Sequence, residues 1–282
     1  ASDVIVRSPS ITTFNCEDVV QATYNTLEQF PDRKLIGEDV ISCGSINNKY
    51  LSSHRILSTG THLGDGFYGK ASGKKVIYRV IADCLVVNNK IIEEWIIRDE
   101  ASILKQLGLN INQFVETKIN DGTFLKKDLK FSKNAFFQKH SIFKCTENLA
   151  TIYKNNFRNL INLNTSKIEE IYERSSQLFW IGGELICTRD KILEKWSSFL
   201  SCFNILKCEV LNDISLKQND YNPRSALRWR ITSSHDSFGI FGMPTNKQVE
   251  IYGISHAEFG KHGIIREFIL IDEISVWKQI LL

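Results

Sequence analysis

A sixteen-residue segment that occurs twice constrains the fold of this chain more than any other feature. IIEEWIIRDEASILKQ at residues 91–106 returns as IIREFILIDEISVWKQ at 264–279, with nine of the sixteen positions identical at an offset of 173 residues. Self-similarity at a fixed offset is the signature of a duplicated structural unit. The sequence therefore predicts two copies of one module.

The repeat extends towards the N-terminus without a gap. The same offset joins seven further identical pairs: Arg55 and Arg228, Thr59 and Thr232, His62 and His235, Gly66 and Gly239, Gly69 and Gly242, Lys74 and Lys247, and Val76 and Val249. Earlier still, residues 16–30 match 189–203, and both segments place apolar residues at helical spacing. Thr188 is a suitable N-cap for the second helix.

Each module has the pattern of a helix, several strands and a short closing helix. Strand composition is found in residues 41–46, 54–63, 75–87 and 90–99. Asn88 and Asn89 fit a tight hairpin turn. The closing helix at 99–108 has Asp99 as its N-cap and Gly108 as its stop. Hairpin-linked strands with segregated helices indicate an α+β fold with an antiparallel sheet.

The repeat divides the chain into three parts. We expect a first module at 1–109, a lysine-rich connection at 110–147 and a second module at 148–282. The amphipathic helix expected at 148–163 has no counterpart, because subtracting 173 leads to a position before residue 1. The first module should therefore lack its opening helix. The side of the first module on which this helix would lie should be open, or covered by part of the connection or by a neighbouring chain.

Composition excludes several classes of function. The hydrophobic fraction is 43%, and 35 basic against 32 acidic residues give a net charge of only +3. Such balance argues against a nucleic-acid partner, and no apolar run reaches the roughly 18 residues of a membrane span. Seven cysteines without metal-site spacing predict no metal site. They are typical of reduced thiols in a cytoplasmic protein.

The stretches at 30–41, 50–76 and 91–108 resemble the SnoaL-like polyketide cyclase family, within the nuclear transport factor 2-like superfamily. The second copy carries the same resemblance at 228–259 and 264–279. The resemblance implies two tandem cone-shaped α+β barrels, each a curved antiparallel sheet wrapped by helices around an apolar cavity. A pseudo-twofold would relate them, as in homodimers of single-module relatives, with Tyr252 and His256 between the sheet backs.

The candidate proton-transfer residues lie on the last strand. In the cyclases that this chain resembles, an aspartate here is the acid/base, and the alignment places it at Ile96 and Ile269, which cannot move a proton. Glu94 and Glu267 share the pocket-facing parity. A carboxylate in an apolar cone has a raised pKa and can act as a base. The alternative is a rim glutamate paired with Arg98 or Arg55.

Two histidines and two aspartates also recur. His62 and His235 precede the glycine-rich connections, and histidine suits proton transfer near neutral pH. The alternative is a histidine bonded to the backbone of a hairpin. Asp99 and Asp272 each stand where a helix begins, which capping explains without catalysis.

The second module has more polar candidates for ligand contact. Arg228 and Arg230 share strand parity and could receive an anionic oxygen. The full set of expected ligand contacts is Arg228, Arg230, Trp180, Phe241, Ser255 and Arg55. The glycines of 64–74 do not lead into a helix and so form no phosphate cradle. We expect the better-formed pocket in this module.

Three hypotheses for function follow. The first is an enzyme that cyclises or isomerises a hydrophobic carbonyl compound by proton transfer, which needs no metal or cofactor. The second is a binding protein for an apolar small molecule. The third is a structural tandem whose cones are filled by their own side chains. The modules should pair within the chain, and further oligomerisation is left open.

Overall fold

The computed structural model describes residues 1–9, 11–46, 48–127, 129, 148–163 and 170–282. The first module contains, in chain order, β1 (Ile5–Arg7), β2 (Thr12–Phe14), α1 (Cys16–Gln29), β3 (Lys34–Ile46), β4 (Lys49–Thr61), β5 (Lys75–Val87), β6 (Lys90–Arg98) and α2 (Glu100–Leu107). The second contains α5 (Leu149–Ile161), β7 (Tyr172–Trp180), the 3-10 turn η1 (Ile181–Gly183), β8 (Glu184–Cys187), α7 (Arg189–Leu200), β9 (Phe203–Leu216), β10 (Arg224–His235), β11 (Gln248–Phe259), β12 (Ile264–Ile271) and α8 (Glu273–Leu281). Between them, α3 (Ile111–Asn120) follows α2.

The two sheets have the same topology. Their strand orders are β2-β1-β6-β5-β4-β3 and β8-β7-β12-β11-β10-β9. Even the irregularities repeat, because the bulge between Leu85 and Val86 returns between Glu258 and Phe259, 173 residues on. The predicted tandem of α+β cones is confirmed. The sheets are mixed and open rather than closed barrels, because the edge strands do not pair with each other and β1 and β7 run parallel to β6 and β12, respectively.

Local sequence signals explain the ends of the elements. Asn88 and Asn89 both have positive φ, as the predicted tight turn between β5 and β6 requires. Asp99 caps α2 by accepting from the amide of Ser102, and Gly108 ends it in the left-handed conformation. Thr188 occupies the predicted N-cap position of α7 without a side-chain capping bond.

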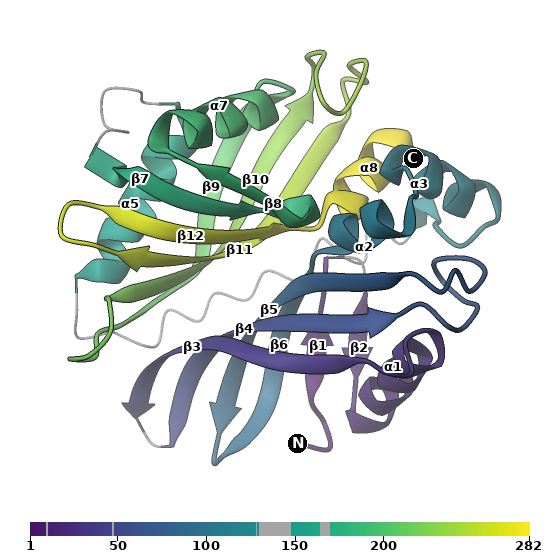
Figure 1. Ribbon diagram of the computed structural model, residues 1–282, viewed down its shortest axis with the longest axis horizontal. Helices are drawn as coiled ribbons and strands as arrows, with labels where there is room; N and C mark the ends of the chain where they lie inside the picture. Colours follow the sequence, from purple (N-terminus) through teal and green to yellow (C-terminus); the bar gives the residue numbers. More distant parts are fainter. Residues whose placement is uncertain (10, 47, 128, 130–147, 164–169) are drawn as a thin grey trace.

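The modules pack sheet against sheet, with most helices outside and α2, α3 and α8 gathered at one end (Figure 1). Equivalent strands meet across the interface, since β3 contacts β9, β5 contacts β11 and β6 contacts β12. Individual contacts repeat as well: Arg228 lies 4.0 Å from the ring centre of Trp95, and Arg55 lies 3.6 Å from that of Phe268. This self-complementary pattern is that of a pseudo-twofold.

The predicted interface residues lie in this contact. Tyr252 belongs to an apolar cluster built from both modules, together with Ile81 and Trp95. His256 is fully buried, and its Nε2 lies 2.7 Å from the hydroxyl of Ser53. Burial of both apolar and hydrogen-bonded groups fixes the two modules in one arrangement.

The modules differ on the side of the opening helix. In the second module, α5 packs on β9, β10 and α7. In the described part of the chain no helix takes the equivalent place in the first module, and apolar side chains stay exposed there. Val20 and Tyr24 on α1 are 46% and 59% exposed, and Leu35 on β3 is 57% exposed.

Candidate functional site

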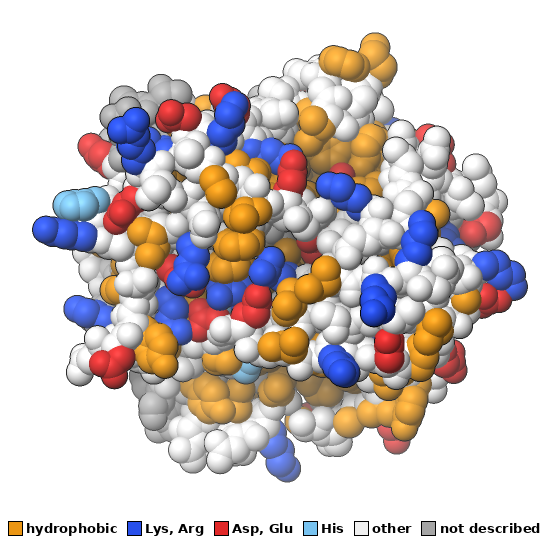
Figure 2. All heavy atoms as spheres, in the orientation of Figure 1, with side chains coloured by type: hydrophobic (Ala, Val, Ile, Leu, Met, Phe, Trp, Pro, Cys, Tyr) orange, Lys and Arg blue, Asp and Glu red, His pale blue; other side chains and the backbone are white. Residues whose placement is uncertain are grey.

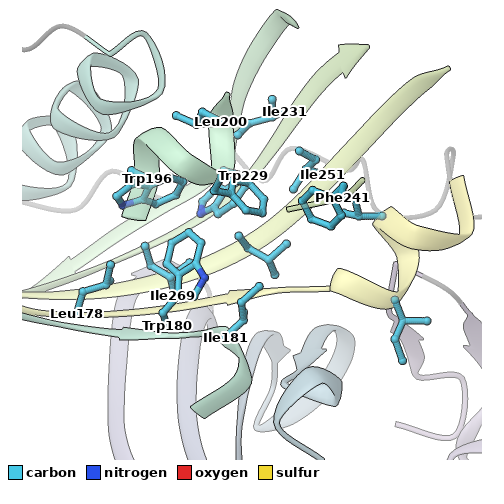
Figure 3. Packing of buried hydrophobic residues seen from close by; sticks show 14 of the residues in the cluster. Leu178, Trp180, Ile181, Trp196, Leu200, Trp229, Ile231, Phe241, Ile251 and Ile269 are labelled. Carbon is cyan, nitrogen blue, oxygen red and sulfur yellow. The ribbon is translucent and has the colours of Figure 1, made fainter. Parts of the chain in front are cut away.

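Aromatic side chains fill the interior of the second module. Trp180, Trp196 and Trp229 lie close together, with ring centres of Trp180 and Trp196 only 4.8 Å apart (Figure 3). Phe157 of α5 packs on Trp229 at 4.8 Å, and Phe241 is buried in the same cluster. We expected the better-formed pocket here. Instead, the predicted ligand contacts Trp180 and Phe241 are part of a packed core.

Glu267 is sealed inside this core. The hydroxyl of Tyr153, on α5, donates to it at 2.5 Å, and the hydroxyl of Tyr172, on β7, donates to its other oxygen. Burial raises the pKa of Glu267 to about 7, although the two hydroxyl bonds oppose the shift. Ser255 lies in the same interior and accepts from the indole of Trp229 at 3.2 Å. Strand alternation predicts that Glu267 faces the interior, as it does, but it does not predict Tyr153 and Tyr172 as its partners.

The two histidines have matching surroundings. The Nδ1 of His62 lies 3.1 Å from the hydroxyl of Ser72, and that of His235 lies 3.2 Å from the hydroxyl of Thr245. Both rings are buried, and burial lowers the pKa of each histidine. Their main chains also close the glycine-rich loops. The rings thus bond to side-chain hydroxyls and not to the hairpin backbone that the alternative named, and a catalytic role for either histidine stays a prediction.

The three arginines lie on the faces that the modules turn towards each other. Arg228 is fully buried beside Asp83, at 3.3 Å, and burial lowers its pKa to about 10. Arg55 contacts Glu38 at 3.2 Å, and Arg230 pairs with Glu209. The strand register explains their place: Leu227 is opposite Ser255, so its neighbour Arg228 points away from the interior. None of the three arginines therefore lies in the interior, where ligand contacts were expected.

Glu94 and Ile96 of the first module are less buried than Glu267 and Ile269, their equivalents in the second. Glu94 is half-buried, and no hydrogen bond or ion pair joins it to another described residue. Burial raises its pKa. The two arginines that could have paired with it are engaged elsewhere, Arg98 with Glu100 and Arg55 with Glu38. Ile96, where the resemblance places the cyclases' aspartate, is half-buried on the same face.

Three further polar side chains share this face. Pairing between strands puts Ser52, Cys84 and Glu94 in one row across β4, β5 and β6. His54, two residues from Ser52, forms a 2.9 Å hydrogen bond with its hydroxyl through Nε2. Burial lowers the pKa of His54, opposed by Asp83. Alternation along YLSSHRIL could have indicated His54, since it shares the parity of Ser52.

Asp99 has a second task besides capping. Its carboxylate also accepts from the amides of Gly182 and Gly183 in η1, at 2.9 and 3.3 Å, and so joins α2 to the second module. Burial raises the pKa of Asp99 while these amides lower it. The capping interpretation of Asp99 and Asp272 is confirmed.

Among the described residues, the His, Cys, Asp and Glu side chains form no group of three that could hold a metal ion. Within those same ranges, no helix combines the length and apolar character needed to cross a membrane. Cys43 is disulfide-bonded, so the expectation of reduced thiols is wrong at that position. Cytoplasmic location stays a prediction.

Comparisons with known proteins bear on the fold. No protein-family model matches the sequence, and no curated protein matches it. Among solved structures, a SnoaL-like polyketide cyclase from Agrobacterium tumefaciens is similar at 14% identity and a TM-score of 0.37, covering 48% of this chain and 98% of that one. IdmH from Streptomyces antibioticus is similar at 21% identity and a TM-score of 0.33, covering 39% and 81%.

Solved SnoaL-like polyketide cyclases are thus among the structures to which this chain is similar, and each of these matches spans about half of it. At these identities and scores, the likeness concerns the fold and carries no information on an activity.

Proposed function

We propose that the first module binds a hydrophobic carbonyl compound and moves a proton on it, with Glu94 as the base. The observation that supports this most is the state of Glu94: a half-buried carboxylate, with a raised pKa and no partner among the described residues. Structural carboxylates in this chain look different, because Glu267 is held by two hydroxyls and Asp99 by three amides. A half-buried carboxylate with a raised pKa and no partner among the described residues is a functional-site candidate.

The reaction needs a base, an oxygen donor and room for the substrate. Glu94 takes the proton from the carbon next to the carbonyl, which leaves an enolate. Return of the proton at another carbon is an isomerisation, and attack of the enolate on a second carbonyl is a cyclisation. β4 and β6 flank β5 and so lie about 10 Å apart, twice the usual strand spacing, with Glu94 and His54 on the same face of the sheet. His54 would donate to the enolate oxygen.

The second module would then serve as support. Its equivalent carboxylate, Glu267, already has two hydroxyl donors, and Leu227 stands where the first module has His54. The hypothesis of a filled cone thus suits the second module, and that of a binding site suits the first. Proton transfer and simple binding differ only in whether Glu94 reacts.

Hydrogen–deuterium exchange tests the proposal directly. 2-Tetralone, a hydrophobic ketone, is incubated with the full chain in D2O, and loss of the proton signal next to its carbonyl is followed by NMR. We expect catalysed exchange, and we expect Glu94→Gln to reduce it about 100-fold or more, the usual size of a general-base contribution. The pH dependence should have its inflection above the ordinary glutamate value, because the pKa of Glu94 is raised.

Glu93→Gln is the matched control, since Glu93 is on the same strand but faces away and pairs with Arg7 at 3.6 Å. It should leave the exchange rate unchanged. Binding of 2-tetralone by both variants without any catalysed exchange would favour the non-catalytic binding protein. No binding at all would remove the first module as the site.

A further inference from the structure

We propose that the interface between the modules holds a second binding site, for a small uncharged aromatic molecule of one or two rings. A cavity of about 170 Å³ lies there, which we term the inter-module cavity. Its walls include Leu57, Ile77 and Arg79 from the first module, and Phe179, Trp180 and Phe268 from the second. The site is separate from Glu94, which is on the opposite face of the first sheet.

The pseudo-twofold provides an internal comparison for this cavity. Positions 173 residues on from Ile36, Leu57, Ile77 and Arg79 are Glu209, Arg230, Glu250 and Tyr252. In the second module these four residues bond to one another, through Arg230 to both glutamates and through Tyr252 to Glu250. The equivalent place at the other end of the interface is thus occupied by a polar network.

At the end of the interface that holds the cavity, three of the four equivalent residues are apolar, namely Ile36, Leu57 and Ile77. Ile36 and Ile77 are 52% and 50% exposed, although the same positions in the second module carry glutamates. Figure 2 shows hydrophobic side chains among acidic and basic ones in the middle of one face of the molecule. Exposed apolar side chains next to a cavity lined by aromatic and aliphatic residues with a few polar groups are typical of a ligand-binding surface.

The charges on the cavity wall are already satisfied, so the ligand should be uncharged. Arg79 donates twice to Glu38, both at 2.9 Å, and its guanidinium lies 4.8 Å from the ring centre of Phe179. Asp99 uses its oxygens for the amides of Ser102, Gly182 and Gly183. A charged ligand would have to break one of these pairs, which costs more than it gains in a partly buried place.

Size and shape indicate the ligand class. An apolar cavity of about 150 Å³ in another protein binds benzene, so about 170 Å³ accepts one ring or a compact two-ring system. Besides the paired Arg79 and Asp99, the walls include the rings of Phe179, Trp180 and Phe268, which suits a flat aromatic molecule. Because such a ligand touches both modules, its binding should stabilise their association by mass action.

Indole is a suitable probe, and isothermal titration calorimetry with the full chain is the measurement. We expect saturable binding to the wild type with a matching rise in Tm, and at least tenfold weaker binding of indole-3-acetate, its anionic analogue. The double substitution Leu57→Arg with Ile77→Glu copies the second-module residues into this end. It should weaken indole binding at least tenfold.

Leu35→Arg is the control, because Leu35 is equally exposed but on the other face of the sheet. It should bind indole as the wild type does. Leu57→Phe, which fills space without adding charge, keeps the test valid if the double variant fails to fold, and it should also weaken binding. Absence of saturable binding by the wild type, or unchanged affinity in both cavity variants, would overturn the proposal. Neither result affects the exchange experiment on Glu94.

Discussion

Glu94 and Glu267 are the same residue on equivalent strands, yet one is half-buried without a described partner and the other is enclosed by two tyrosines. The residues around them account for the difference. Tyr153 comes from α5, a helix without a described counterpart in the first module. Trp229, which fills the second interior, is replaced by Ile56 at the equivalent position.

This comparison shows how a duplicated fold can divide its tasks. Strand order, bulges and glycine loops are kept in both copies, because they determine the fold of the sheet. Interior side chains are free to differ, since one copy fills its cone with buried aromatic residues while the other leaves Ile56 and Glu94 half-buried. The same division appears at the interface, where one end has a polar network and the other a cavity.

The largest expected difference between the modules is in the response to truncation of interior residues. Trp229→Ala should cost about 3–5 kcal/mol of unfolding free energy, because it leaves a cavity among Phe157 and Trp196. Ile56→Ala, at the equivalent position, should cost about 1–2 kcal/mol, since Ile56 is only half-buried. Urea unfolding followed by circular dichroism measures both. Equal losses would mean that the first interior is as tightly packed as the second.

Most of the fold could be predicted from the sequence, because the signals that define it are local or repeated. The Asn88–Asn89 turn and the Asp99 cap depend on neighbours within a few residues. The interior could not be predicted in the same way. Alternation separates the two faces of β10 but does not say which face looks inward, so Arg228 and Arg230 were assigned to a pocket.

The residues that surround each carboxylate are also far from it in the sequence. Tyr153 is 114 residues from Glu267 along the chain, and no pattern in the sequence joins them. The inter-module cavity likewise depends on Leu57 and Phe268 meeting across two modules. Such contacts can be predicted only when the positions of both sheets are known.

The next largest difference concerns pH. The pKa of Glu267 in the folded chain is about 7, above the unfolded value of about 4.3. The folded state therefore holds the extra proton in this window, and wild-type stability should fall as pH rises from 4.5 to 7. Glu267→Gln removes this titrating carboxyl and its pH-dependent contribution to stability. The difference in unfolding free energy between variant and wild type should therefore change by on the order of 3 kcal/mol across that range. Urea unfolding at several pH values measures it.

Glu94→Gln is the matched variant for this experiment. The pKa of Glu94 is also raised, so the change has the same sign, but solvent reaches its half-buried carboxylate and the effect should be smaller. A larger pH effect at Glu94 than at Glu267 would reverse the assignment of open and closed interiors.

The smallest expected difference is between the two histidines, and it tests the part of the comparison in which the modules agree. His62 and His235 bond to equivalent hydroxyls, and their ring centres lie 5.4 and 5.7 Å from those of Phe30 and Phe203. His62→Gln and His235→Gln should therefore each cost about 1 kcal/mol, and the two losses should agree within about 0.5 kcal/mol. Because the two sites are in different modules, the double variant should lose the sum. Urea unfolding of the three variants measures this. A clear excess at one histidine, or loss of 2-tetralone exchange on His62→Gln with stability preserved, would show that the copies of this loop have also diverged and that the histidine acts on the ligand.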